Sequence, residues 1–217
     1  MVNFKNTSLI IELQYFGTIN WIKSFNNYSH VKIDVCDNFQ KGGWRNRTAI
    51  AGADGRRLIT VPLHGGRDQH GLYSSVKISY KDNWPEQHIR TIESCYRRAP
   101  FYEFYADPIF DILRSRPEYL VQLNLAILEK IREWVFPPLN FTLTDQYDPN
   151  PGPEYDDLRN RSENGVNGKS GTSTELPWQP VYQQVFEDRN GFIPGLGILD
   201  LLFCCGPSAK SLLKDSV

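Results

Sequence analysis

Residues 34–47 carry the side chains best suited to bind a ligand. They follow a short apolar run, turn at two adjacent glycines, and bring Lys41, Arg45 and Arg47 close together in the sequence. Ligands of α/β proteins bind beyond the carboxyl ends of strands, where loops are anchored by a rigid sheet. Guanidinium groups bind phosphate and carboxylate through two parallel hydrogen bonds. This stretch therefore predicts an anion-binding corner, with a solvated cationic rim as the simpler alternative.

His88 is the candidate catalytic residue, as a general base. An imidazole accepts a proton near neutral pH without a large change in its pKa. His88 falls in a predicted helix, in line with Ile92 and Cys95. A lone histidine in that setting is more often structural, so both interpretations remain open.

Three further residues are candidates for binding substrate. Gln14 and Tyr15 follow the first predicted strand, where they can orient a donor or a sugar. Tyr15 can equally be a core residue, as most buried aromatics are. Asn46 stands between the two arginines of the corner and joins them as a candidate.

Two polar residues lie within apolar segments, Asn124 in a long helix and Asp200 in the segment 198–203. Buried polar groups usually have internal partners, so we assign both to structural support. If Asp200 paired with Arg45 or Arg47, the support and the anion-binding corner would form one network.

The totals exclude several classes of protein. Among 217 residues, 24 are Lys or Arg and 25 are Asp or Glu, so a general nucleic-acid binder is disfavoured. The N-terminus lacks a secretory signal, and no run approaches the roughly 18 apolar residues of a membrane-spanning helix. We therefore expect a cytoplasmic protein without membrane insertion. The cysteines lack metal-site spacing and no Walker or dinucleotide motif occurs, so we expect no metal, while any cofactor stays unknown.

The periodicity predicts an α/β fold. Residues 9–13 and 31–35 read as buried strands around a helix capped by Thr18, which is the start of a parallel βαβ unit. Residues 48–50 and 57–63 form a predicted hairpin around an Asp-Gly turn. The class is a mainly parallel, Rossmann-like sheet with a β-hairpin extension and covering helices.

Other elements follow along the chain. Residues 76–80 alternate as a half-buried strand does, and residues 84–99 have helical spacing that Pro100 ends. Asp107 reads as the cap of a short helix with Pro108 in its first turn, and Pro117 opens the longest helix.

Composition divides the chain into three parts. Residues 1–144 are predicted to form an α/β core with a helical cover. Residues 145–178 are rich in Pro, Gly, Asn and Ser, and are predicted to be a flexible polar insert, either a lid or simply disordered. Residues 179–217 are predicted to be a C-terminal helical segment that packs back on the core.

The ordered combination of these stretches resembles the WbqC-like family of bacterial surface-polysaccharide gene clusters. The matching pieces are Leu13-Gln14-Tyr15-Phe16-Gly17, residues 38–47 with their Lys-x-x-x-Arg-Asn-Arg core, residues 58–62, Trp84-x-x-x-His88, Tyr96-x-x-Ala99-Pro100-Phe101, the Leu123-Asn124 helix and residues 191–203. The chain departs from longer members at Leu13 and Gly17, which stand where those have prolines. It also has Gly195-Leu196-Gly197 where they have Asn-Leu-Ser.

The resemblance implies an enzyme that makes O-antigen or a related glycan, since members are described as glycine transferases. Such a reaction transfers a small acyl or aminoacyl (glycyl) group from a phosphate- or thioester-linked donor to a sugar acceptor. Two alternatives remain. The chain can be a non-catalytic partner that binds a nucleotide-sugar or another enzyme of the pathway, or it can be a nucleotidyltransferase. The oligomeric state is not predicted.

Overall fold

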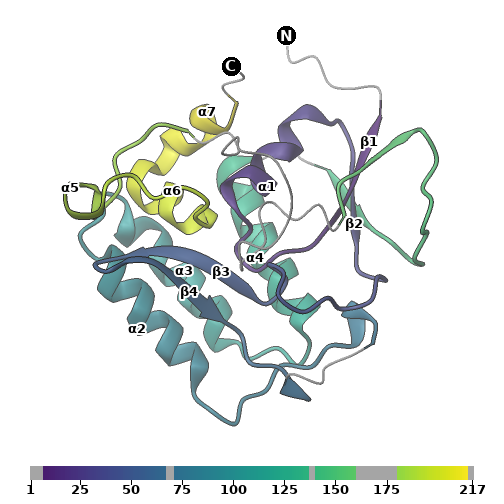
Figure 1. The fold of residues 1–217 in the computed structure, drawn as a ribbon, viewed down its shortest axis with the longest axis horizontal. Coiled ribbons are helices and arrows are strands. Elements are labelled where there is room, and N and C mark those ends of the chain that lie inside the picture. Colours follow the sequence, from purple (N-terminus) through teal and green to yellow (C-terminus); the bar gives the residue numbers. More distant parts are fainter. Residues whose placement is uncertain (1–6, 67–70, 137–139, 160–179, 215–217) are drawn as a thin grey trace.

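The structure is a computed structural model that describes residues 7–66, 71–136, 140–159 and 180–214 (Figure 1). A four-stranded parallel sheet and a separate antiparallel hairpin are surrounded by helices. The predicted class, an α/β fold with a parallel sheet, a hairpin extension and covering helices, is confirmed.

The parallel sheet has the strand order β5-β2-β1-β6. Its strands are β1 (Ser8–Glu12), β2 (Val31–Asp34), β5 (Phe141–Leu143) and β6 (Tyr155–Asp157). Along the chain this order is third, second, first, fourth. The chain therefore builds outward from β1 on one side and returns to its other side with β6, which creates a topological switch point between β1 and β6.

The first βαβ unit forms as predicted. Helix α1 (Ile19–Ser24) follows β1, and the Thr18 hydroxyl caps it by accepting the Trp21 backbone N–H at 3.1 Å. A short 3₁₀ turn, η1 (Phe25–Asn27), leads into β2, which runs parallel to β1. The apolar strand residues are buried on both faces, as the continuous apolar pattern of β1 requires.

The hairpin consists of β3 (Arg47–Gly52) and β4 (Gly55–Thr60), with Arg47 opposite Thr60. Ala53 and Asp54 make its turn, one residue before the predicted Asp-Gly pair, and Gly55, with a positive φ of 106°, begins β4. Helix α2 packs against β3, and Figure 1 shows it below the hairpin, away from the parallel sheet.

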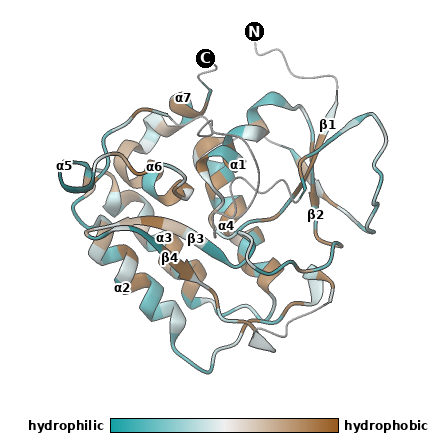
Figure 2. Cartoon of the chain, viewed as in Figure 1, coloured by the Kyte–Doolittle hydropathy of each residue, from teal (hydrophilic) through white to brown (hydrophobic). Residues whose placement is uncertain are grey.

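Three helices form the main cover: α2 (Trp84–Tyr96), α3 (Tyr102–Arg114) and α4 (Leu120–Val135). The predicted start of α3 at Asp107 is wrong, because the helix begins at Tyr102 and contains Pro108 in its interior. Tyr105 and Ala106 are buried, so packing extends the helix on the N-terminal side of the proline. In Figure 2, α4 and α6 contain many residues coloured as hydrophobic, and most of the buried residues of both helices are apolar.

The C-terminal segment contains α5 (Glu187–Asn190), α6 (Ile198–Cys205), the 3₁₀ turn η4 (Gly206–Ser208) and α7 (Ala209–Lys214). Helix α6 contacts α1, α3 and β3. Close packing at its start favours glycine at position 197. A Cβ on Gly197 would lie 2.2 Å from the Thr48 Oγ1.

Three strands differ from the sequence prediction. The strand predicted at residues 76–80 is wrong, because this stretch makes only the isolated bridges Lys77 to Tyr119 and Ile78 to Leu63, beside the 3₁₀ turn η3 (Tyr73–Ser75). Strands β5 and β6 were not predicted. Strand β6 falls within residues 145–178, where we predicted a flexible insert. Residues 160–178 lie outside the described residues. The flexible insert and the three-part division therefore remain predictions. No helix among the described residues is long and apolar enough to cross a membrane.

Candidate functional site

Three parallel strands each end in an acidic residue, so three carboxylates lie at the carboxyl-terminal end of the sheet. Glu12 ends β1, Asp34 ends β2 beside it in register, and Asp157 ends β6. Glu12 and Asp34 are buried, whereas Asp157 is half-buried. We call this group the acidic edge. It stands at the carboxyl ends of the strands, where open α/β sheets bind their ligands.

Arg159, two residues after β6, joins two members of the acidic edge. Its Nη1 donates to Asp34 Oδ2 at 2.6 Å and its Nη2 to Asp157 Oδ2 at 2.7 Å. The hydrogen bonds with Asp157 and Asp34 raise the pKa of Arg159 above its ordinary value. Arg159 was not a predicted site residue. Its one sequence signal is an arginine that directly follows the motif Tyr-Asp-Asp-Leu in a polar stretch.

Arg45, predicted to bind an anion, points into the protein. Its Nη2 donates to Asp37 Oδ2 at 2.7 Å, and Nη1 donates to the Asn38 carbonyl. Its guanidinium lies over the Tyr73 ring at 5.2 Å. Asn124, predicted as structural support, donates from Nδ2 to the Arg45 carbonyl and to the Tyr73 hydroxyl. These buried contacts fix the conformation of residues 37–45 within the predicted corner.

The other residues of the predicted corner have separate environments. Lys41 is exposed, and Asn46 is buried with Nδ2 donating to the Val61 carbonyl. Arg47 is half-buried, and its buried Nε has no hydrogen-bond partner among the described residues. Burial also lowers the pKa of Arg47. Within the described residues, Arg47 thus has a buried donor without a partner.

His88 and Tyr15 form a buried pair. The Tyr15 hydroxyl and His88 Nδ1 are hydrogen-bonded at 3.0 Å, and the Trp84 ring packs edge-on against the imidazole. Burial lowers the pKa of His88 to about 4, while a contact with the Thr60 backbone acts in the opposite direction. His88 is therefore neutral near pH 7, and its predicted role as a base remains a prediction.

The predicted anion-binding corner, residues 34–47, is connected to His88 by hydrogen bonds of the buried Tyr15. Tyr15 donates its backbone N–H to the Trp44 carbonyl at 2.9 Å, while its hydroxyl reaches His88. The two cavities described below are not lined by His88, Arg45 or Arg47. Residues 34–47 and α2 are thus joined by the packed side chain of Tyr15, and neither of these cavities lies between them.

Asp200 has two tyrosines as partners. The Tyr96 hydroxyl donates to Oδ1 at 2.8 Å, and the Tyr182 hydroxyl donates to Oδ2 at 2.6 Å. The suggested pairing with Arg45 or Arg47 is therefore wrong. Burial raises the pKa of Asp200, and neutral hydroxyl donors satisfy its oxygens without a buried cation. The hydrogen bonds join α6 to α2 through Tyr96 and to the segment before α5 through Tyr182.

A pocket of about 210 Å³ opens beside the acidic edge, at the switch point between β1 and β6. We call it the switch-point pocket. Its lining comes from the end of β1, from α1 and from the residue after β6: Ile11, Glu12, Gln14, Asn20, Trp21, Ser24 and Leu158. It is the place where an open α/β sheet is expected to bind a small ligand.

The comparison with known proteins agrees with the resemblance in the sequence. Residues 13–159 match the WbqC-like protein family. The chain belongs to the WbqC-like family. A relative is the uncharacterized protein Rv1507c of Mycobacterium tuberculosis, 25% identical over 228 residues that cover 92% of this chain and 91% of the relative. No solved structure matches.

Hydrogen bonds hold the polar groups of the pocket in this WbqC-like protein. Gln14 Nε2 donates to Glu12 Oε1 at 3.2 Å, and Gln14 Oε1 accepts the Thr18 backbone N–H at 3.1 Å. Trp21 Nε1 donates to the Glu12 carbonyl at 2.9 Å. Of the predicted substrate-binding residues, Gln14 is the one that lines this pocket, and Tyr15 follows it in the core.

The turn that forms the pocket adopts a rare backbone conformation. Phe16 and Gly17 have positive φ values of 53° and 33°, directly after β1. A Cβ on Gly17 would lie 2.4 Å from Trp21 Cε3, so glycine is required for the indole to reach its place. A non-glycine residue in the left-handed region is uncommon and is found disproportionately at functional sites.

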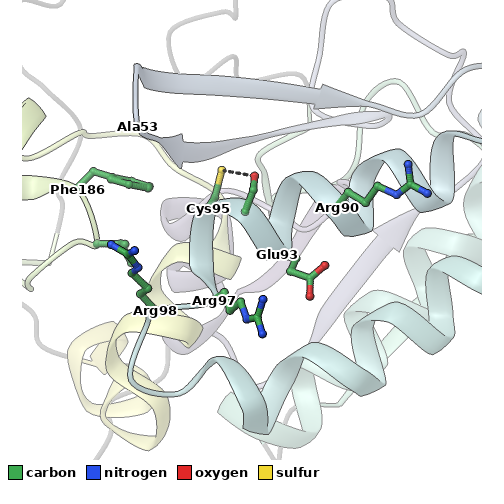
Figure 3. Close-up of a pocket in the computed structure, with 9 residues that line it drawn as sticks. Ala53, Arg90, Glu93, Cys95, Arg97, Arg98 and Phe186 are labelled. Atoms are coloured by element: carbon green, nitrogen blue, oxygen red, sulfur yellow. Dashed lines mark hydrogen bonds between the residues drawn. The ribbon is translucent and has the colours of Figure 1, made fainter.

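A second cavity lies on the outer side of α2 and is lined mainly by that helix and by Val185 and Phe186 (Figure 3). It contains no predicted site residue. Within the described part of the chain, no three His, Cys, Asp or Glu side chains are grouped as a metal site requires.

Proposed function

We propose that this WbqC-like protein transfers a small acyl or aminoacyl group, such as glycyl, to a sugar in the synthesis of a bacterial surface polysaccharide. The observation that carries the proposal is the switch-point pocket, where Glu12, Gln14, Asn20 and Ser24 surround a small space beside Trp21. The family membership supports the setting in glycan synthesis.

The composition of the pocket suits a sugar. Sugar hydroxyls both donate and accept hydrogen bonds, and a carboxylate, two amides and a hydroxyl offer both kinds of partner. An indole adds an apolar face with a polar edge. The volume of about 210 Å³ is below the roughly 300–1,000 Å³ of drug-sized sites, so the pocket suits a single ring.

Glu12 is the proposed base at the acceptor. The amine of an amino sugar attacks the activated carboxyl carbon, forming a C–N bond while the C–O or C–S bond to phosphate or thiol breaks. The electron pair leaves with the phosphate or thiolate, and the amine proton passes to the Glu12 carboxylate. Glu12 lines the pocket and its carboxylate accepts a hydrogen bond from Gln14, whereas His88 does not line the pocket, so we favour Glu12 over the packed imidazole.

The donor carries negative charge and needs cationic partners outside the small pocket. Arg47, with its free buried Nε, and the exposed Lys41 are the proposed partners for that charge. We also propose that the reaction takes place in the cytoplasm, where phosphate- and thioester-linked donors are made.

The mass of the surface polysaccharide tests the proposed function. Deleting the gene should remove a small acyl or aminoacyl group from the repeating unit, and the wild-type gene should restore it, as measured by mass spectrometry of the purified glycan. A glycan of unchanged composition but altered chain length or amount would instead support a non-catalytic partner. Pyrophosphate release from a nucleoside triphosphate by the purified protein would support the nucleotidyltransferase.

A further inference from the structure

The cavity on the outer side of α2 is formed by three distant parts of the chain. Its volume is about 460 Å³. We call it the arginine groove. The hairpin turn, the C-terminal half of α2 with the two residues after it, and the segment before α5 contribute its lining: Ala53, Arg90, Glu93, Ser94, Cys95, Arg97, Arg98, Val185 and Phe186.

Cationic side chains dominate the rim of the groove. Arg90, Arg97 and Arg98 are exposed, and the one acidic lining residue is Glu93. In the part of the chain that the structure describes, none of these three arginines forms an ion pair or a hydrogen bond with its side chain. Their guanidinium groups therefore keep their full hydrogen-bonding capacity for a ligand, and Arg binds phosphate through two parallel bonds.

The inner side of the groove is apolar. Cys95 is buried at its base, and Phe186 and Val185 form the opposite wall. Figure 3 shows the Arg98 side chain extending toward the same end of the groove as the Phe186 ring. A ligand that fits must therefore combine an anionic group with a flat or apolar part.

The size separates a small molecule from a macromolecule. A volume of about 460 Å³ falls within the roughly 300–1,000 Å³ of small-molecule sites. A protein partner would need a surface of about 1,000 Å² or more, of which the groove is a small part.

We infer that the arginine groove binds a nucleoside diphosphate, with the phosphates held by Arg98 and the cationic rim and the base against Phe186. Arg90 and Arg97 extend the positive rim, and in Figure 3 both side chains point away from the Phe186 ring. This site is separate from the switch-point pocket, because the two linings share no residue. The inference goes beyond the proposed transfer and does not depend on it.

Isothermal titration of UDP and ADP into the purified full-length protein tests the inference. We expect saturable binding at low salt that weakens as the ionic strength rises, since exposed charges are screened. The double variant Arg97→Ala/Arg98→Ala should raise Kd at least about tenfold, because charge-assisted hydrogen bonds are lost. Phe186→Ala should weaken UDP and ADP while leaving inorganic pyrophosphate unaffected.

A matched control removes the same charge elsewhere. Lys130→Ala/Arg132→Ala deletes two cations of α4 that pair with Glu133 and Glu129, and it should leave Kd unchanged. The inference is overturned if neither nucleotide binds saturably at low salt, or if both double variants bind alike. It is also overturned if pyrophosphate binds as tightly as UDP and Phe186→Ala changes nothing.

Discussion

Asp34 links the two outer strands of the parallel sheet to its centre. Its Oδ2 accepts from Arg159, which follows β6, and its Oδ1 accepts from the hydroxyl of Thr144, which follows β5. The backbone N–H groups of Cys36 and Asp37 also donate to Oδ1. A fully buried carboxylate requires such partners, so one side chain couples the ends of strands β5, β2 and β6.

The first prediction removes the cation of this group. Arg159→Met should lower the free energy of unfolding by about 3–5 kcal/mol, because it leaves the Asp34 carboxylate buried without a counter-charge. Urea denaturation followed by circular dichroism measures the change. The exposed pair Arg132–Glu129 is the control, and Arg132→Met should cost less than about 1 kcal/mol. Equal losses in the two variants would contradict the structural role of Arg159.

The second prediction concerns the neutral imidazole of His88. Its folded pKa of about 4 lies below the ordinary 6.5, so between these values protons bind the unfolded chain preferentially. The contribution of His88 is therefore complete above pH 6.5 and is lost as the pH falls toward 4. Its full size is about 3 kcal/mol.

The variant His88→Gln isolates this effect, because an amide can still bond to the Tyr15 hydroxyl but does not titrate. Urea midpoints at several pH values should show a shallower decline for the variant than for the wild type between pH 6.5 and 4. Parallel declines would show that His88 is protonated in the folded protein.

At the scale of elements, the turn between β1 and α1 sets the geometry of the switch-point pocket. Gly17 has a positive φ and lies against the Trp21 ring, so the glycine and the indole are fixed together. The third prediction is that Gly17→Ala lowers stability by about 2 kcal/mol or more through backbone strain and overpacking.

Thermal unfolding checks this prediction, and Gly43→Ala is its control. The nearest atom to a Cβ at Gly43 is the Gln40 carbonyl oxygen at 3.9 Å, so that variant should unfold near the wild-type temperature. A wild-type melting temperature for Gly17→Ala would show that the turn can relax and that it does not determine the position of Trp21.

Elements with a strong local pattern were predicted from the sequence, whereas those made by distant contacts were not. A local pattern of a few residues indicates the strand at residues 9–13, the capped helix that follows it, and the hairpin that contains the Asp-Gly pair. Strands β5 and β6 have three residues each, in polar surroundings, and Asp34 helps to hold them through contacts more than 100 residues apart in sequence. No local pattern carries that information.

At the scale of the whole molecule, the candidate site was predicted in part. The sequence indicated the carboxyl end of β1 and named Gln14, which lines the switch-point pocket. Glu12 was missed because it looks like an ordinary polar residue at the end of a strand. Arg45 was predicted to bind a ligand anion, and in the structure its guanidinium forms a buried ion pair with Asp37. Residue types indicate which side chains could bind a ligand, whereas the fold decides which of them are already paired within the protein.

The molecule separates two kinds of surface. The switch-point pocket is small, with one carboxylate and neutral polar groups, and the arginine groove is larger and cationic. The linings of the two cavities share no residue. Variants of one surface should therefore leave the other unchanged, so transfer and nucleotide binding can be tested independently.

The most direct test of the proposed transfer is the amount of modified repeating unit made by cells in which only the Glu12→Gln variant replaces the wild-type protein. Mass spectrometry of the glycan, at matched protein levels, should show at least about a tenfold loss of the small group, since a positioned base contributes about 10²–10⁴-fold. The control Glu129→Gln alters an exposed glutamate of α4 and should retain full modification. Full modification by Glu12→Gln, with its loss in His88→Gln, would contradict the account and assign the base to the imidazole.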